Sequence, residues 1–149
     1  MSFKSRFRNW VYNYRMFGTI KGGIGLECEI KYIQNIEIGK NTYINGGKIY
    51  ASPNAKIIIG NNSLISYNVH LRTDSHRYQD ADILINKQGH VEKDIFIKDD
   101  VWIGAGAQIM AGITIETGCV IGAGSVVTKS TRPYGVYAGV PAKLIKSRE

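Results

Sequence analysis

The chain has 149 residues, a length that fits one domain and leaves no room for a second folded unit. Hydrophobic residues make up 44% of it and charged residues 21%, proportions that exclude a disordered or collagen-like chain. No apolar run approaches the roughly 20 residues that span a bilayer, and no signal-peptide core is present, so we expect a cytoplasmic protein. The net charge of +7 is compatible with nucleic acid, an anionic membrane or a phosphorylated ligand.

An amphipathic helix is expected over residues 1–19. Large aromatic residues recur there at spacings of four, three, four and three, at Phe3, Phe7, Trp10, Tyr14 and Phe17. We expect their apolar face to cap the end of the β structure that follows. Five basic residues lie within the first 25 positions and no acidic residue precedes Glu27, which gives a second hypothesis, contact with the inner face of a membrane.

A repeat of six residues starts at about residue 36. Aliphatic residues at this spacing, with one shift of register, are Ile38, Ile44, Ile59, Ile65 and Leu71. Three residues are inserted near Ser52-Pro53-Asn54, where we expect a bulge. Residues 77–94 break the pattern, and we expect them to form a loop outside the repeat.

The repeat is most regular over residues 95–132. Six aliphatic residues follow one another there at intervals of six, and they are Ile97, Ile103, Ile109, Ile115, Ile121 and Val127. This period fits neither a helix nor a simple alternating strand. Three such segments, each with one aliphatic side chain inward, make a triangular coil of about 18 residues, and coils stack about 4.8 Å apart. The sequence therefore predicts one mainly β domain, a parallel β-helix over about 36–71 and 95–132 with a tail over 133–149. The alternative, a β-sandwich, would need alternating polarity with turns about every 8–12 residues.

Three segments are more specific than the repeat itself, and they are residues 101–105 (VWIGA), 121–129 (IGAGSVVTK) and 138–143 (AGVPAK). With these segments, residues 36–146 resemble the hexapeptide-repeat acyltransferases, especially the galactoside and maltose O-acetyltransferases and their relatives in surface-polysaccharide biosynthesis. The resemblance implies a left-handed β-helix and a homotrimer with active sites between subunits. It also implies acetyl-CoA as the acyl donor and a sugar or glycan as the acceptor, with no nucleic-acid partner.

In that family CoA lies along the groove between two coils. The residues that match its contacts are Trp102, Gly104, Ala105, Ala123, Thr128, Lys129 and Lys143. Small residues let backbone groups approach the pantetheine arm, and lysines can meet the phosphates as point charges. Simple packing is the alternative for any one glycine or alanine, and burial in a subunit interface is the alternative for Trp102.

Acetyl transfer to a hydroxyl needs a base that accepts the hydroxyl proton, and histidine suits neutral pH. His76 lies five residues after Leu71 and matches the catalytic histidine of the family. His70 is expected to be structural, whereas His90, in the loop, is a candidate for contact with the acceptor. The resemblance also suggests Asn45 near the acceptor, and we expect Asp74 to bond the His76 imidazole and fix its tautomer.

The resemblance implies an acetyl-CoA-dependent O-acetyltransferase that transfers the acetyl group directly. No nucleophile elbow or Cys-His pair in the sequence supports covalent catalysis. An N-acyltransferase of an amino sugar or antibiotic would use the same base and donor. A γ-carbonic-anhydrase-like protein would need three histidines converging on zinc, and His70, His76 and His90 lack the expected spacing, so no residue is assigned to a metal. A non-catalytic binding member of the family is the remaining alternative.

Overall fold

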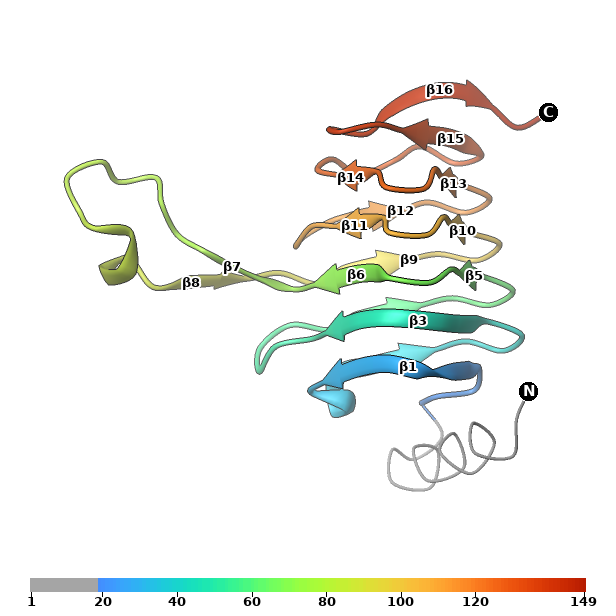
Figure 1. The fold of residues 1–149 in the computed structure, drawn as a ribbon, viewed down its shortest axis with the longest axis horizontal. Coiled ribbons are helices and arrows are strands. Elements are labelled where there is room, and N and C mark those ends of the chain that lie inside the picture. The colour runs from blue at the N-terminus through green and yellow to red at the C-terminus, as the bar shows by residue number, and fades with distance from the viewer. Residues whose placement is uncertain (1–18) are drawn as a thin grey trace.

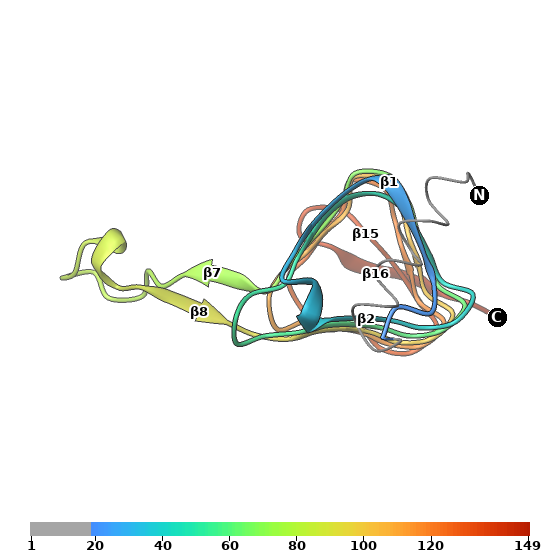
Figure 2. The same ribbon diagram turned by 90° about the horizontal axis from the view of Figure 1, so that it is seen from below.

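A computed structural model of the chain describes residues 19–149. Over these residues the chain forms a parallel β-solenoid with a triangular cross-section, and one long hairpin stands away from it (Figures 1 and 2). The predicted mainly β coil of hexapeptide repeats is therefore confirmed. The amphipathic helix expected over residues 1–19 and the cap assigned to it fall on residues 1–18, outside the described residues.

The solenoid has three faces. Face A consists of β2 (Ile36–Ile38), β4 (Ile57–Ile59), β9 (Ile95–Ile97) and β12 (Thr114–Ile115). Face B contains β5 (Leu64–Ile65), β10 (Trp102–Ile103), β13 (Val120–Ile121) and β15 (Gly135–Ala138). Face C contains β6 (Val69–Arg72), β11 (Gln108–Ile109) and β14 (Val126–Val127).

The remaining elements connect or close these faces. Two long strands, β1 (Gly23–Lys31) and β3 (Tyr43–Tyr50), run through both face B and face C. At the carboxyl end β16 (Lys143–Ser147) pairs antiparallel with β15. A 3-10 turn, η1 (Ile33–Asn35), precedes β2, and the projecting hairpin contains β7 (Asp74–His76), η2 (Ile85–Lys87) and β8 (His90–Glu92).

The register of face A shows where the coils differ in length. Ile97 pairs with Ile115, 18 residues later, which is the length expected for three hexapeptides. Ile38 pairs with Ile59, 21 residues later, and the extra residues form the turn that Ser52 and Ala55 close. The predicted three-residue bulge is thus confirmed.

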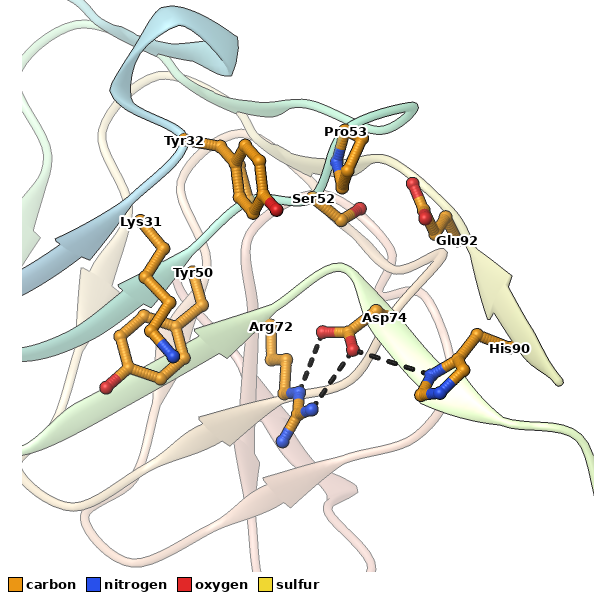
Figure 3. A pocket seen from close by; sticks show the side chains of 10 residues that line it. Lys31, Tyr32, Tyr50, Ser52, Pro53, Arg72, Asp74, His90 and Glu92 are labelled. Carbon is orange, nitrogen blue, oxygen red and sulfur yellow. Dashed lines mark hydrogen bonds and ion pairs between the residues drawn. The ribbon is translucent and has the colours of Figure 1, made fainter. Parts of the chain in front are cut away.

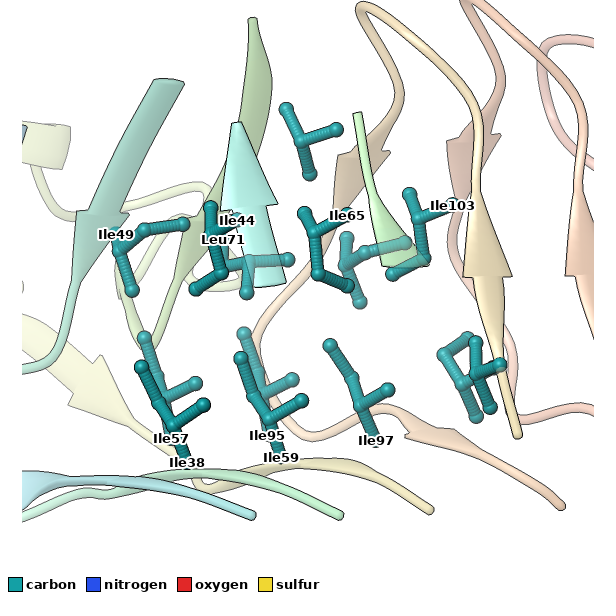
Figure 4. Close-up of a cluster of buried hydrophobic side chains, with 14 of the residues drawn as sticks. Ile38, Ile44, Ile49, Ile57, Ile59, Ile65, Leu71, Ile95, Ile97 and Ile103 are labelled. Carbon is teal, nitrogen blue, oxygen red and sulfur yellow. The ribbon is translucent and has the colours of Figure 1, made fainter. Parts of the chain in front are cut away.

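The core is a column of stacked aliphatic side chains along the solenoid axis (Figure 4). The six regularly spaced positions from residue 97 to residue 127 are each no more than 1% exposed. Burial of one such side chain stabilises a protein by about 1.5–3 kcal/mol, so the stack is the main source of stability.

Adjacent coils approach too closely for a side chain at some glycines. A Cβ on Gly104 would lie 2.6 Å from the backbone nitrogen of Ala123 in the next coil. Gly124 differs, because its Cβ would meet nothing within 4 Å but its φ is +67°, in the left-handed region that favours glycine.

Gly104→Ala is expected to lower the free energy of unfolding by about 3 kcal/mol, since two rigid backbones must separate. The matched variant Gly124→Ala is expected to lower it by about 1 kcal/mol, from backbone strain alone. Urea denaturation of both variants measures the difference. Equal losses would contradict the close approach of the coils at Gly104.

Candidate active site

The hairpin leaves the solenoid at the corner between face C and face A. The backbone nitrogen of Thr73 still donates to Tyr50 of the preceding coil, and Lys93 donates back to the carbonyl of Thr73 at 2.8 Å. The loop expected outside the repeat at about residues 77–94 is this hairpin, and it begins three residues earlier, at Asp74. Because β7 continues as an extended strand, His76 lies on the hairpin itself.

Hydrogen bonds brace this hairpin along its length. Arg77 donates its backbone N–H to Gly89 and its side-chain Nε to the carbonyl of His90, both at 3.0 Å. Farther out, the Gln88 amide donates to the carbonyls of Asp80 and Ile83, at 2.8 and 2.7 Å. The pairing of β7 with β8 places His76 directly opposite His90.

A cavity of about 260 Å³ lies between the base of the hairpin and face C. The sequence-predicted residues Asp74 and His76 both line it, and its full lining is His70, Arg72, Asp74, Ser75, His76, Gln108, Ile109 and Met110. His76 is exposed, so its imidazole is accessible to a bound molecule. This arrangement leaves space for a hydroxyl group beside the imidazole.

A chain of charged and aromatic groups runs through the base of the hairpin (Figure 3). Arg72 donates two hydrogen bonds to Asp74, from Nε at 2.8 Å and from Nη2 at 3.0 Å. Asp74 Oδ2 lies 3.9 Å from Nδ1 of His90, and the His90 and His76 rings lie 4.3 Å apart between centroids. The hydrogen bond from Arg72 lowers the pKa of Asp74, so this carboxylate is ionised at neutral pH.

The expectation that Asp74 bonds the His76 imidazole needs correction. Among the described residues, the side-chain partners of Asp74 are Arg72 and His90, and no hydrogen bond joins it to His76. The Arg72 guanidinium instead donates to both oxygens of the Asp74 carboxylate.

His70 occupies the same cavity on a more buried position of β6. Burial is the main cause that lowers its pKa, and the nearby charges of Lys48 and Arg72 act in the same direction. Its ring meets the Tyr50 ring edge-on, with centroids 5.7 Å apart. His70 is therefore a neutral part of the wall at physiological pH.

A second cavity, of about 280 Å³, shares Arg72 and Asp74 with the first (Figure 3). Its other lining residues are Lys31, Tyr32, Tyr50, Ala51, Ser52, Pro53, His90 and Glu92. The ammonium group of Lys31 lies 4.5 Å from the centre of the Tyr50 ring. Aromatic faces combined with charged hydrogen-bonding groups suit a polar ring such as a sugar.

The residues expected to bind CoA are distributed around face C. Ala105 and Ala123 lie in adjacent coils at the corner with face B, where Gly104 donates to Ile121 and Gly124 donates to Ala105. Thr128 and Lys129 follow β14 at the corner with face A, the corner from which the hairpin leaves. Both edges of face C thus carry exposed candidate contacts.

The other expected site residues lie farther from the hairpin. Trp102 is 51% exposed on face B, next to Leu64 and Val120 in the strand ladder. Lys143 begins β16, opposite Ala138. Asn45 lies within β3 and lines neither of the two cavities.

Arg72 and Met110 are cavity residues that the sequence did not single out. The signal for Arg72 was its position two residues before Asp74, on the same side of an extended chain. Nothing in the sequence indicated Met110. It follows a buried isoleucine at a corner of the coil, and the repeat does not specify which residue type occurs there.

The fold and the cavity together define a hexapeptide-repeat solenoid with a histidine-lined site at the base of a hairpin. The family model for the bacterial transferase hexapeptide (six repeats) matches residues 94–129. A maltose O-acetyltransferase from Clostridium difficile 630 is 30% identical, with a TM-score of 0.75 over 98% of this chain and 85% of that one. The chain belongs to the hexapeptide-repeat acetyltransferases and is an acyltransferase.

Two further solved structures are similar. A galactoside acetyltransferase in complex with coenzyme A is 30% identical, with a TM-score of 0.74 over 97% of this chain and 80% of that one. A hexapeptide-repeat acetyltransferase from Vibrio cholerae is 29% identical, with a TM-score of 0.84 over 99% of this chain and 82% of that one. The comparison with curated proteins finds no match.

No group of three or more histidine, cysteine, aspartate or glutamate side chains among the described residues is arranged to hold a metal ion. Within residues 19–149, no helix has the length and apolar character to cross a membrane.

Proposed function

We propose that the protein is an acetyl-CoA-dependent O-acetyltransferase that acts on a hydroxyl of a sugar or surface-polysaccharide precursor. The observation that carries the proposal is the accessible imidazole of His76 in the cavity against face C. The similar proteins support the proposed donor and acceptor. The Vibrio cholerae acetyltransferase has been solved with acetyl-CoA, and two others are named for maltose and galactoside.

In the proposed reaction His76 accepts the proton of the acceptor hydroxyl as its oxygen attacks the thioester carbonyl carbon. The carbonyl becomes a tetrahedral oxyanion, which a backbone N–H stabilises. The carbon–sulfur bond then breaks, and the thiolate of CoA takes the proton from the imidazolium. The products are an acetyl ester and free CoA, and His76 returns to its neutral state.

The donor is proposed to cross face C between its two edges, with its reactive end at the cavity. Ala105 and Ala123 leave room for the pantetheine arm at one edge, and Thr128 and Lys129 lie at the other. Trp102, Gly104 and Lys143 complete the proposed set. Because Trp102 and Asn45 lie outside the cavity, their roles require a neighbouring copy, in keeping with a homotrimer that forms the site between subunits.

Lys129→Ala is expected to weaken CoA binding about fivefold, because an exposed lysine contributes a modest, screened attraction to a phosphate. The loss should shrink at high salt. Isothermal titration with CoA measures it, with Lys87→Ala on the hairpin as a charge-matched control that should bind normally. Equal affinities of the two variants would remove Lys129 from the donor site.

The acceptor is proposed to enter through the second cavity, where its ring can lie against Tyr32 or Tyr50 and its hydroxyls can bond Arg72 and Asp74. A screen of sugars, glycosides and nucleotide sugars with acetyl-CoA, following thiol release, tests the function. Acceptor-dependent release is the expected result. Release that no hydroxyl acceptor accelerates would contradict the proposal.

An N-acyltransferase is the second candidate, because the same base can serve an amine. A Bacillus cereus N-acyltransferase shares the fold at 22% identity and a TM-score of 0.66, a likeness that carries the fold alone. Amino sugars therefore belong in the screen, paired with the corresponding hydroxyl sugars.

A further inference from the structure

The hairpin places two imidazoles against each other. His76 on β7 and His90 on β8 are direct cross-strand partners, and their rings lie 4.3 Å apart at a tilt of 44°. Two protonated imidazoles at this separation would repel each other, so their protonation is coupled.

The two rings have unequal surroundings. Asp74 Oδ2 lies 3.9 Å from Nδ1 of His90, whereas no ion pair joins His76 to any of the described residues. Arg72 holds the Asp74 carboxylate through two hydrogen bonds, which fix both its orientation and its charge. A proton that enters the pair is therefore more stable on His90 than on His76.

We propose that His90 is a positioning residue that carries the first proton of the pair and so keeps His76 in its neutral, base form. This inference rests on the proposed role of His76 as the base. It gives His90 a function in the reaction that differs from the acceptor contact suggested by its position in the loop.

Other charged groups around the pair do not reverse this preference. Glu92 and Lys31 line the second cavity with His90 and carry opposite charges. His70 lines the same cavity as His76, and burial lowers its pKa, so it stays neutral. The Arg77 guanidinium bonds the backbone carbonyl of His90 and disfavours a cation there. Asp74 is nevertheless the only carboxylate that forms an ion pair with either ring among residues 19–149.

The consequence is a shift in the pH dependence of the reaction. A cation on His90 repels a second cation on His76, because the two rings lie close together near the protein surface. Activity in the wild type should therefore persist to lower pH than in a variant that lacks the His90 cation.

The test is the pH profile of kcat/KM for the wild type and three variants. His90→Gln removes the charge, and the low-pH side of the profile should move to higher pH. His90→Lys restores a permanent cation, and the low-pH side of its profile should return to the wild-type position or lower. Lys87→Gln, at the far part of the hairpin, should leave the profile unchanged.

Histidine-labelled NMR titration of the whole protein gives a readout that does not need activity. In His90→Gln the His76 ring should take up its proton at higher pH than in the wild type. If His90→Gln changes neither the pH profile of kcat/KM nor the NMR titration of His76, the inference is overturned, while the assignment of His76 as the base stays intact. Loss of activity at all pH values in His90→Gln would also overturn it, because His90 would then be the base itself.

Discussion

Turnover of His76→Ala is expected to fall by about 10²–10⁴-fold, the usual contribution of general-base assistance. The side chain lines the cavity against face C and is exposed to a bound acceptor. The contacts proposed for CoA lie elsewhere, at the edges of face C, so the Kd of CoA should change by less than about threefold. Steady-state kinetics and calorimetric CoA titration measure the two quantities.

His70→Gln is the matched comparison, because His70 lines the same cavity but is partly buried with a lowered pKa. Its turnover is expected to fall less than about tenfold. If His70→Gln loses as much activity as His76→Ala, the base assignment is wrong. If His76→Ala loses CoA binding as well, the side chain belongs to the donor site.

Ile109→Asp is expected to prevent folding. The side chain is 1% exposed within the stacked core, so the change removes apolar contacts and places an unpaired carboxylate there. Each effect costs several kcal/mol, against a typical domain stability of about 5–15 kcal/mol. Circular dichroism and thermal melting of the purified variant measure the outcome.

Met110→Asp is the control for this substitution, because the adjacent side chain is 42% exposed. It adds the same charge at the next position of the chain and should melt within a few degrees of the wild type. A cooperative wild-type melt for Ile109→Asp would contradict the stacked core.

The solenoid could be predicted because its repeat is local. A buried aliphatic every sixth residue from Ile97 to Val127 specifies coil length, face and core without any knowledge of distant contacts. The three-residue bulge could also be predicted, since an insertion shifts the next aliphatic residue by three positions and leaves the rest of the repeat unchanged. The first residue of the hairpin could not be predicted, because residues 74–76 contain no aliphatic residue that would indicate an extended strand.

The site was predicted less completely, for a physical reason. His76 and Asp74 could be named, but the pairing of His76 with His90 depends on the register of β7 and β8 across a long loop. The spacing of 14 residues between them does not determine that register. The sequence consequently paired Asp74 with the imidazole on its own strand, and it did not indicate the two hydrogen bonds from Arg72.

The chemical nature of the product tests the proposed O-acetyl transfer most directly. The best acceptor from the screen is converted with acetyl-CoA, and the purified product is analysed by NMR before and after mild alkali. The account predicts one acetyl ester on a sugar hydroxyl for each CoA released, removed by alkali. An alkali-stable amide on an amino sugar, or CoA release without an acetylated sugar, would contradict it.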